Sequence, residues 1–213
     1  MKQQELTDSS KFSMVSRYAF APVYPYLAGQ IIDKFGLYSG TCIDVGSGPG
    51  NLAIEIARIT EMKVYSLDIQ PEMSRLARNN IRQAGLSERI TAVTADVCQM
   101  PFPQDWADLV VSRGSIFFWE NQTAGCCEIF RVLKPGGVAY CGGGMGTPEI
   151  RAQVLQNIRE NAVFSQERDY WIYNIGKTRK RLDPEGLCAS LEELGVQAMV
   201  ERENDGIWIQ MKK

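Results

Sequence analysis

Two hydrophobic periods alternate along the chain. Short runs rich in β-branched residues, typical of strands, occupy residues 41–45, 63–67, 90–94, 108–112 and 137–141. Longer segments with helical spacing cover residues 51–59, 71–84 and 120–133, and a further helix starts near Pro148. Strands that are apolar on both faces and alternate with helices are typical of a parallel sheet covered on both sides, so the pattern predicts an α/β fold.

The last part of the chain predicts a different strand pairing. Residues 184–194 have helical spacing and are closed by Gly195, and two strand-like runs follow at 197–202 and 207–211. Asp205 and Gly206 lie between these runs, and Asp-Gly at such a place is a hairpin signal. We therefore expect seven strands in one mostly parallel sheet, with helices on both faces and an antiparallel hairpin at the C-terminal end.

Two stretches do not fit the alternating core. Residues 12–35 are rich in Tyr and Pro and precede the first strand, while residues 147–183 are longer than one crossover helix requires. Extra segments beside the carboxyl edge of an open parallel sheet commonly carry substrate contacts, because ligands bind there. We therefore predict an N-terminal helical lid or substrate segment at 1–37 and a main domain at 38–213, with an insert at about 147–183.

A glycine-rich turn follows the first strand and narrows the choice of ligand. Gly46-Ser47-Gly48-Pro49-Gly50 leads directly into a helix that opens at Asn51. A dinucleotide fingerprint needs its third small residue where Asn51 stands, and a P-loop needs Gly-Lys-Ser/Thr, which is missing. The pattern that fits is D-x-G-x-G-x-G with Asp44 first. A carboxylate there would repel a pyrophosphate and attract an ammonium or sulfonium, which favours a cationic nucleoside.

The composition excludes several chemistries and locations. The chain has 213 residues and no His, so a Ser-His-Asp triad, a His general base and a His-ligated metal cannot be built from it. The net charge of −2 argues against nucleic acid as a partner. The lack of a long apolar run argues against a membrane span, and the polar first residues argue against a signal peptide. We expect a cytoplasmic monomer or homodimer whose six Cys are reduced and mostly buried.

Four motifs in register resemble a known family. IDVGSGPGN is similar to motif I of the class I S-adenosylmethionine-dependent methyltransferases, and the resemblance covers about residues 38–211. VYSLDIQPEM places Asp68 where the family's acidic residue takes both ribose hydroxyls. TADVCQMPF places Asp96 where the family contacts the adenine amino group, with Val97 beside the ring. FRVLKPGG resembles the turn of small-molecule members related to the ubiquinone and menaquinone methyltransferases.

The resemblance implies a Rossmann-like fold, S-adenosylmethionine as cofactor and S-adenosylhomocysteine as product. It also implies a cofactor-binding set of Asp44, Gly46, Ser47, Gly48, Gly50, Asn51, Asp68, Ile69, Asp96, Val97, Ser112 and Arg113. Taken singly, the glycines could form a structural turn, Asp68 could cap the next helix and Asp96 could be a turn residue. Likewise, Ser112 and Arg113 could border the methionine end of the cofactor, or Ser112 and Ser115 could cap the following helix.

The end of the fourth strand bears on the acceptor. DLVVSRGSIFFW has no Asn/Asp-Pro-Pro-aromatic motif, no Pro-Cys nucleophile and no metal-binding Asp of the catechol type, so the sequence resembles a metal-independent enzyme for a small molecule. In-line methyl transfer depends mainly on alignment, so without His the acceptor is already nucleophilic or is deprotonated by Tyr, Asp, Glu, Lys or Cys. No catalytic residue is singled out. Carbon, nitrogen, oxygen, sulfur and a metalloid stay open as the acceptor atom.

Aromatic and basic residues are the candidates for substrate contacts. Tyr18, Tyr24, Tyr26, Phe117 and Trp119 could wall a site over the reactive methyl, or could simply be core and lid packing. The basic run Lys177, Arg179, Lys180 and Arg181 is a solvated face or a contact for an acidic substrate or RNA. The alternatives are therefore a methyltransferase for RNA or protein and a non-catalytic cofactor-binding protein. An NAD(P)-dependent oxidoreductase fits less well because of Asn51 and the missing catalytic His or Tyr-x-x-x-Lys.

Overall fold

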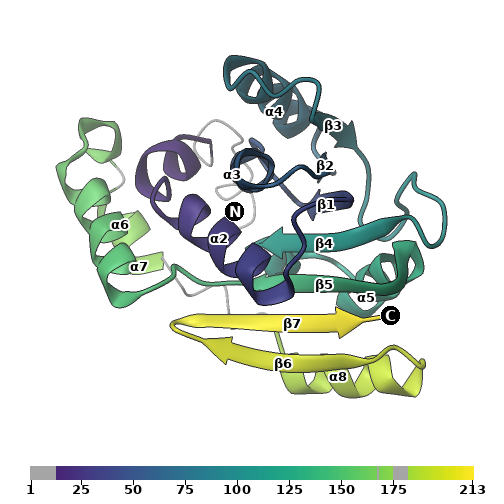
Figure 1. The fold of residues 1–213 in the computed structure, drawn as a ribbon. Helices are drawn as coiled ribbons and strands as arrows, with labels where there is room; N and C mark the ends of the chain where they lie inside the picture. The colour runs from purple at the N-terminus through teal and green to yellow at the C-terminus, as the bar shows by residue number, and fades with distance from the viewer. Residues whose placement is uncertain (1–12, 167, 175–181) are drawn as a thin grey trace.

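The computed structural model describes residues 13–166, 168–174 and 182–213, and these residues contain one seven-stranded sheet. The strand order is β3-β2-β1-β4-β5-β7-β6, as Figure 1 shows. Neighbours among β1–β5 are parallel, whereas β7 runs antiparallel to both β5 and β6. The predicted sheet and its C-terminal hairpin are thus confirmed. The strands are β1 (Thr41–Val45), β2 (Lys63–Asp68), β3 (Ile90–Thr94), β4 (Ala107–Arg113), β5 (Leu133–Gly143), β6 (Ala198–Glu203) and β7 (Gly206–Lys212).

Helices cover both faces of the sheet, because successive strand residues point to opposite sides. In β4, Leu109 and Val111 belong to the apolar cluster formed with α2 (Val23–Phe35), α3 (Asn51–Ile59) and α4 (Pro71–Gln83). Val110 belongs to the cluster on the other face, with α5 (Gln122–Val132) and α8 (Pro184–Glu193). The strand segments that are apolar on both faces therefore form the buried middle layer, as the sequence pattern predicts. No helix among the described residues is long and apolar enough to cross a bilayer.

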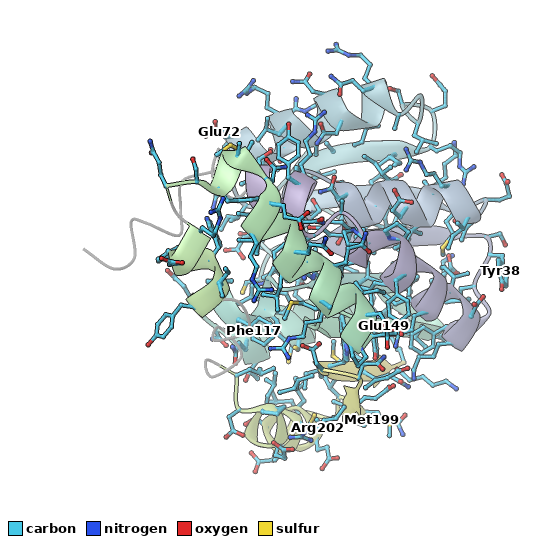
Figure 2. All side chains as sticks on the ribbon, turned by 90° about the vertical axis from the view of Figure 1, so that its left-hand side faces the viewer. Tyr38, Glu72, Phe117, Glu149, Met199 and Arg202 are labelled. Atoms are coloured by element: carbon cyan, nitrogen blue, oxygen red, sulfur yellow. The ribbon has the colours of Figure 1, made fainter. Side chains whose placement is uncertain are left out.

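A third apolar cluster lies at the carboxyl edge of the sheet. It joins η1 (Val15–Ala19) to α6 (Pro148–Glu160) and η3 (Ala162–Phe164), and we call these three elements the cap. Figure 1 shows α6, with α7 (Arg168–Asn174), beside the N-terminal helices on the side toward which β4 points. Seen from that side, α6 crosses the front of the molecule (Figure 2). The cluster contains Val15, Ala19, Val23, Met145, Val154, Ile158 and Phe164.

The N-terminal segment consists of two parts with different packing. Ser16 and its neighbours in η1 belong to the cap, whereas α2 buries Leu27, Ile31 and Ile32 against α3 and the sheet. The expected lid at 1–37 therefore includes a helix of the main core, and its boundary stays a prediction.

The segment before the fifth strand differs from the expected turn. Helix α5 ends at Val132 and β5 begins at once, with a register shift between the pair Ala107–Leu133 and the pair Leu109–Val138. Gly136 has a φ of 83°, and its N–H donates to the carbonyl of Lys213 at 2.7 Å. Because the end of the chain pairs with these backbone groups, Lys134-Pro135-Gly136-Gly137 forms an irregular part of the strand rather than a separate turn.

Candidate active site

The glycine-rich loop after β1 is anchored to β2 and α4 by hydrogen bonds. The Ser47 N–H donates to the carbonyl of Leu67 at 3.0 Å, and the Ser47 and Ser66 hydroxyl oxygens lie 2.7 Å apart. On the far side of the loop, Asn80 Nδ2 donates to the carbonyl of Pro49 at 2.9 Å. These hydrogen bonds fix the shape of the loop, and most of them use its backbone groups.

Three glycines of this loop have a positive φ, namely 62° at Gly46, 54° at Gly48 and 82° at Gly50. A Cβ at Gly46 would overlap the Ser115 side chain, which comes from the end of β4. A Cβ at Gly50 would lie 3.3 Å from both the Ala77 Cβ and the Ser66 Oγ. Gly46 and Gly50 are thus required by the protein's own packing, whether or not a ligand also touches them.

Asp68 closes β2 and connects the loop to it. Its Oδ2 accepts the N–H of Gly48 at 2.8 Å, and its Oδ1 accepts the N–H of Gln70 at 2.9 Å. The side chain is buried, and this burial raises its pKa above the ordinary value although both hydrogen bonds lower it. No side chain caps α4, so the open alternative that Asp68 is an N-cap finds no support. The carboxylate instead fixes the loop and the start of the next turn.

Asp44 lies one strand away and is more deeply buried, with 1% of its surface exposed. Its Oδ2 accepts the N–H of Ala53 in the first turn of α3 at 3.1 Å. Burial raises the pKa of Asp44 to about 8, the Ala53 bond lowers it, and the charge of Asp68 raises it further. A pKa of about 8 favours the protonated carboxyl at pH 7, and a cation close to Asp44 would favour the charged form.

The remaining residues expected to hold the nucleoside follow β2 and β3. Ile69 is 61% exposed, so its aliphatic side chain is accessible at the end of β2. Asp96 is exposed, and its Oδ1 accepts the N–H of Cys98 at 2.9 Å, closing a tight turn. Val97 is buried beside Gly125. Because β2 and β3 are parallel, these residues share one edge with Asp68.

Ser112 near the end of β4 and Ser115 just after it are hydrogen-bonded to each other through their side chains. Ser112 is fully buried, and its Oγ lies 2.6 Å from that of Ser115. The Ser115 hydroxyl also donates to the carbonyl of Val45 at 3.1 Å and accepts the indole N–H of Trp119 at 3.1 Å. Ser115 is the residue at the N-cap of the short helix η2 (Ile116–Phe118), but its side chain makes no capping hydrogen bond. This network joins the ends of β1 and β4 beside Gly46.

Arg113 ends β4 among groups of the N-terminal segment. Its guanidinium carbon lies 4.3 Å from the ring centre of Phe20 and 5.7 Å from that of Tyr24. Nη2 donates to the carbonyl of Gly144 at 3.2 Å. The Tyr24 hydroxyl lies 2.5 Å from Ser16 Oγ, which also accepts a hydrogen bond from Asn51 Nδ2 at 2.8 Å.

The other four aromatic candidates contact different parts of the carboxyl edge. Tyr18 is 40% exposed and pairs with Arg17, while the Tyr26 hydroxyl accepts from Asn204 at the hairpin turn, at 3.0 Å. Phe117 is buried and would lie 2.7 Å from a Cβ at Gly143, and Trp119 packs against Gly125. These contacts match the packing alternative, and a substrate role for the five rings stays a prediction. Lys177, Arg179, Lys180 and Arg181 lie outside the described residues.

Sequence reasoning missed several residues that shape this edge. Ser16, Phe20, Ser66 and Asn80 contact the glycine loop, Asn51 or Arg113 from elements distant in the chain. Nothing local in the sequence indicates these contacts, because each depends on the packed fold. Ser115 follows Arg113 closely, but its contact with Gly46 is equally non-local. Among the residues described, no group of three or more Cys, Asp or Glu side chains could hold a metal ion.

Comparison with known proteins agrees with this geometry. Residues 43–141 match a family model described as a methyltransferase domain. The crystal structure of a candidate S-adenosyl-L-methionine-dependent methyltransferase from Methanococcus maripaludis is 36% identical, with a TM-score of 0.83, over 96% of this chain and 91% of that one. The ubiquinone/menaquinone biosynthesis C-methyltransferase UbiE of a Marinomonas species is 24% identical over 202 residues, which are 89% of this chain and 79% of UbiE.

A further relative matches over a shorter stretch. The demethylmenaquinone methyltransferase of Porphyromonas gingivalis is 36% identical over 116 residues, or 54% of this chain. That stretch spans 46% of the length of the Porphyromonas enzyme.

Proposed function

This chain belongs to the class I S-adenosylmethionine-dependent methyltransferases, and from that premise we propose that it methylates a small-molecule acceptor without a metal ion. The observation that carries the cofactor assignment is the hydrogen-bonding capacity of Asp68. As a carboxylate it has about four acceptor positions, of which the N–H groups of Gly48 and Gln70 use two, one on each oxygen. One position on each oxygen is left, which matches the two hydroxyl donors of a ribose.

Apolar surface beside Asp68 suits the adenine. The exposed side chain of Ile69 and the buried Val97 follow the ends of β2 and β3, where a flat base could lie between them and the turn made by Asp96. A base placed there would cover part of the exposed Ile69 side chain, and burying this apolar surface favours binding. With the ribose at β2 and the adenine at β3, the methionine part of the cofactor extends over β1 toward β4, because the strand order is β3-β2-β1-β4.

When bound, S-adenosylmethionine supplies a methyl group on a positively charged sulfur. The chain's own contribution is positioning: Asp68 fixes the nucleoside, and the Ser112–Ser115–Trp119 network holds the end of β4 against the glycine loop. The cap adds apolar side chains over the same edge, which excludes water from the reacting atoms. No His takes part, so a pH-rate profile with a step near pH 6.5 would have to come from the acceptor or from a shifted carboxylate or thiol.

The small-molecule acceptor is supported by the relatives and by the end of β4. UbiE is named for the biosynthesis of ubiquinone and menaquinone, and the Porphyromonas relative is named a demethylmenaquinone methyltransferase, so both names refer to small quinones. In the described residues the end of β4 is occupied by Ser112, Arg113 and Ser115 rather than by an acidic metal ligand. An RNA or protein acceptor would need a contact surface for which the described residues give no specific support.

The test is calorimetric titration with S-adenosylhomocysteine and with its 2′-deoxyribose analogue. The parent chain should bind the first at least about 10-fold more tightly, because one charge-assisted hydrogen bond is lost in the second. Asp68→Asn should weaken S-adenosylhomocysteine and bind the two ligands alike. Glu72→Gln is the matched control, since Glu72 is an exposed acid in the first turn of α4, close in sequence (Figure 2). Absence of binding at millimolar ligand would refute the proposal.

A further inference from the structure

The segment that joins β3 to β4 has little regular structure of its own. Residues 95–106, which we call the β3–β4 loop, contain one isolated bridge, between Asp96 and Gln99, and no helix. The Gln99 N–H donates to the carbonyl of Asp96 at 3.1 Å and closes the turn that follows β3. A loop with so few backbone hydrogen bonds of its own needs partners from other elements to keep one shape.

Two side chains of α5 bind the middle of the β3–β4 loop by its backbone. Glu128 Oε1 accepts the N–H of Met100 at 2.8 Å. Arg131 Nη2 donates to the carbonyl of Phe102 at 2.9 Å and, more weakly, to that of Met100 at 3.4 Å. Met100 itself is 4% exposed. The loop is therefore fixed by a helix whose contacting residue lies 28 positions further along the chain.

Glu128 and Arg131 are also bonded to each other, and we call this pair the clamp. Arg131 Nε lies 2.6 Å from Glu128 Oε2, and Nη2 lies 2.8 Å from Oε1. Such a two-point contact uses the planar fork of a guanidinium and fixes the direction of its N–H groups. Burial raises the pKa of Glu128, but the hydrogen bonds from Arg131 and from the Met100 N–H bring it below the ordinary value. The clamp is therefore charged at neutral pH.

The clamp holds one end of the turn that begins at Asp96. At the other end the loop is bonded to β2, because the Ala95 N–H donates to the carbonyl of Asp68 at 3.1 Å. Asp96 follows Ala95 directly, and Met100 comes four residues later. The turn is thus fixed on both sides, by β2 before Asp96 and by the clamp after it.

The direction of the Asp96 carboxylate depends on the position of this turn. Its Oδ1 accepts the N–H of Cys98 at 2.9 Å, so the side chain moves with the backbone of the turn. A hydrogen bond from a ligand amino group to this carboxylate weakens steeply when its distance or angle changes. Resting on the proposed function, we propose that Glu128 and Arg131 are positioning residues for the adenine, which hold Asp96 where it accepts the 6-amino group of the cofactor.

This role differs from a general contribution to stability in what it predicts for ligands. If the clamp only stabilised the fold, its loss would weaken every cofactor analogue alike. If it positions Asp96, its loss should weaken mainly the ligand whose base donates to that carboxylate. Selectivity for the base then depends on two side chains that do not touch it.

The decisive experiment compares S-adenosylhomocysteine with its analogue in which hypoxanthine replaces adenine. The two ligands share ribose, sulfur and amino acid, but an oxygen stands in place of the 6-amino group. In calorimetry on the full chain, the parent should prefer S-adenosylhomocysteine by about 10-fold or more, because the oxygen cannot donate to Asp96. Glu128→Ala and Arg131→Met should each lower that preference by about 3-fold or more, chiefly by weakening S-adenosylhomocysteine.

Conservative variants and a measurement without substitution sharpen the test. Glu128→Gln keeps an oxygen for the Met100 N–H and should restore part of the preference, whereas Arg131→Lys should not, because an ammonium lacks the fork. In the unmodified protein, hydrogen exchange of residues 96–100 should slow more with saturating S-adenosylhomocysteine than with saturating analogue. Thermal unfolding sets the temperature at which every variant is compared in its folded state.

The matched control is the pair Glu72 and Arg75 on α4. It has the same spacing of three residues, with Arg75 Nη2 3.7 Å from Glu72 Oε1, and both side chains are more than half exposed. Among the described residues, neither of these side chains donates to or accepts from the backbone of a loop. Glu72→Ala and Arg75→Met should therefore keep the full preference.

Three outcomes would overturn the inference. Equal weakening of both ligands by Glu128→Ala and Arg131→Met would mean that the clamp is structural. An unchanged preference in these variants would mean that the turn keeps its position without the clamp. Equal affinity of the parent for both ligands would mean that Asp96 does not bind the amino group. In each case the nucleoside still binds and the proposed function stands, whereas failure of the parent to bind S-adenosylhomocysteine would refute the proposed function.

Discussion

The carboxyl edge of the sheet has two halves that are held in place by different interactions. The half at β1 and β2 is fixed by backbone groups: the N–H of Ser47, the N–H of Gly48 and the carbonyl of Pro49 all have partners within 3.0 Å. The cap is fixed mainly by apolar side chains, among them Val154 and Ile158 of α6. Within the cap, α6 also makes a hydrogen bond to η1, from Asn157 Nδ2 to the carbonyl of Ala19 at 3.3 Å.

This difference matters for the order of events at the site. Backbone anchoring holds the glycine loop in one shape, and in-line transfer needs a cofactor site that is preorganised in this way. Apolar packing is less directional than hydrogen bonding, so a small shift of the cap should cost less than a shift of the glycine loop. We infer that the cofactor half acts as a rigid template and that the cap supplies the movable cover.

The largest expected effect comes from adding one methyl group to the rigid half. Gly46→Ala puts a Cβ into the Ser115 side chain and forces a φ of 62° on an alanine. We expect the free energy of unfolding to fall by about 2–5 kcal/mol, combining overpacking with left-handed strain, and S-adenosylhomocysteine binding to be lost. Thermal and urea unfolding measure the free energy of unfolding, and calorimetry measures the binding of S-adenosylhomocysteine.

Gly29→Ala is the control for this substitution, because Gly29 lies inside α2 and a Cβ there meets open space. It should stabilise the chain by about 0.5–1 kcal/mol. Adding Ser115→Gly to Gly46→Ala should restore part of the loss, since it removes the overlap but not the strain. A fully stable Gly46→Ala variant would show that the loop is not rigid.

Asp44 gives the second effect, which depends on pH. With a folded-state pKa of about 8 and an unfolded value near 4, the folded chain binds more protons between these limits. Stability is therefore highest at low pH and falls as pH rises toward 8, by at most about 1.4 kcal/mol per unit for this group. Asp44→Asn keeps an acceptor for the Ala53 N–H and should make the thermal midpoint less dependent on pH in this range.

Two further readouts make the Asp44 prediction specific. Asp68 has a pKa shifted in the same direction, so part of the slope should remain in Asp44→Asn. Asp33→Asn, on the exposed side of α2, should leave the slope unchanged. If Asp44 also attracts the sulfonium, Asp44→Asn should weaken S-adenosylmethionine more than the uncharged S-adenosylhomocysteine. An unchanged pH slope would contradict the buried, protonated state.

The two halves were also predictable to different degrees. The bounds of β1, β3 and α3 and the positions of Asp44, Asp68 and the glycine loop follow from local patterns, because strand ends, turns and helix starts have sequence signals. The Ser16 contact with Asn51 spans 35 residues, and the Ser115 contact with Val45 spans 70. Contacts of this kind depend on tertiary packing, which single-sequence periodicity does not encode.

Removing one methyl group from each half should give a smaller, diagnostic effect. Ile158→Val in the cap and Ile43→Val in β1 delete the same group from fully buried side chains. Each should cost about 0.5–1.5 kcal/mol. Ile158→Val should speed hydrogen exchange selectively in η1 and α6 and leave adenosine binding unchanged, whereas Ile43→Val should lower global stability without a local effect. Identical exchange patterns would show that the cap unfolds only with the whole domain.

The smallest expected effect concerns an ion pair between the cap and the C-terminal hairpin. Arg151 Nε of α6 lies 3.7 Å from Asp205 Oδ2, and the two side chains are 52% and 29% exposed. Exposed pairs contribute only about 0–1 kcal/mol and are screened by salt, so Arg151→Gln should lower the thermal midpoint slightly at low salt and not at high salt. Arg159→Gln, at the exposed end of the same helix, should have no salt-dependent effect. A large effect of Arg151→Gln would mean that charge rather than apolar packing holds the cap closed, and the distinction between the two halves would then rest on electrostatics.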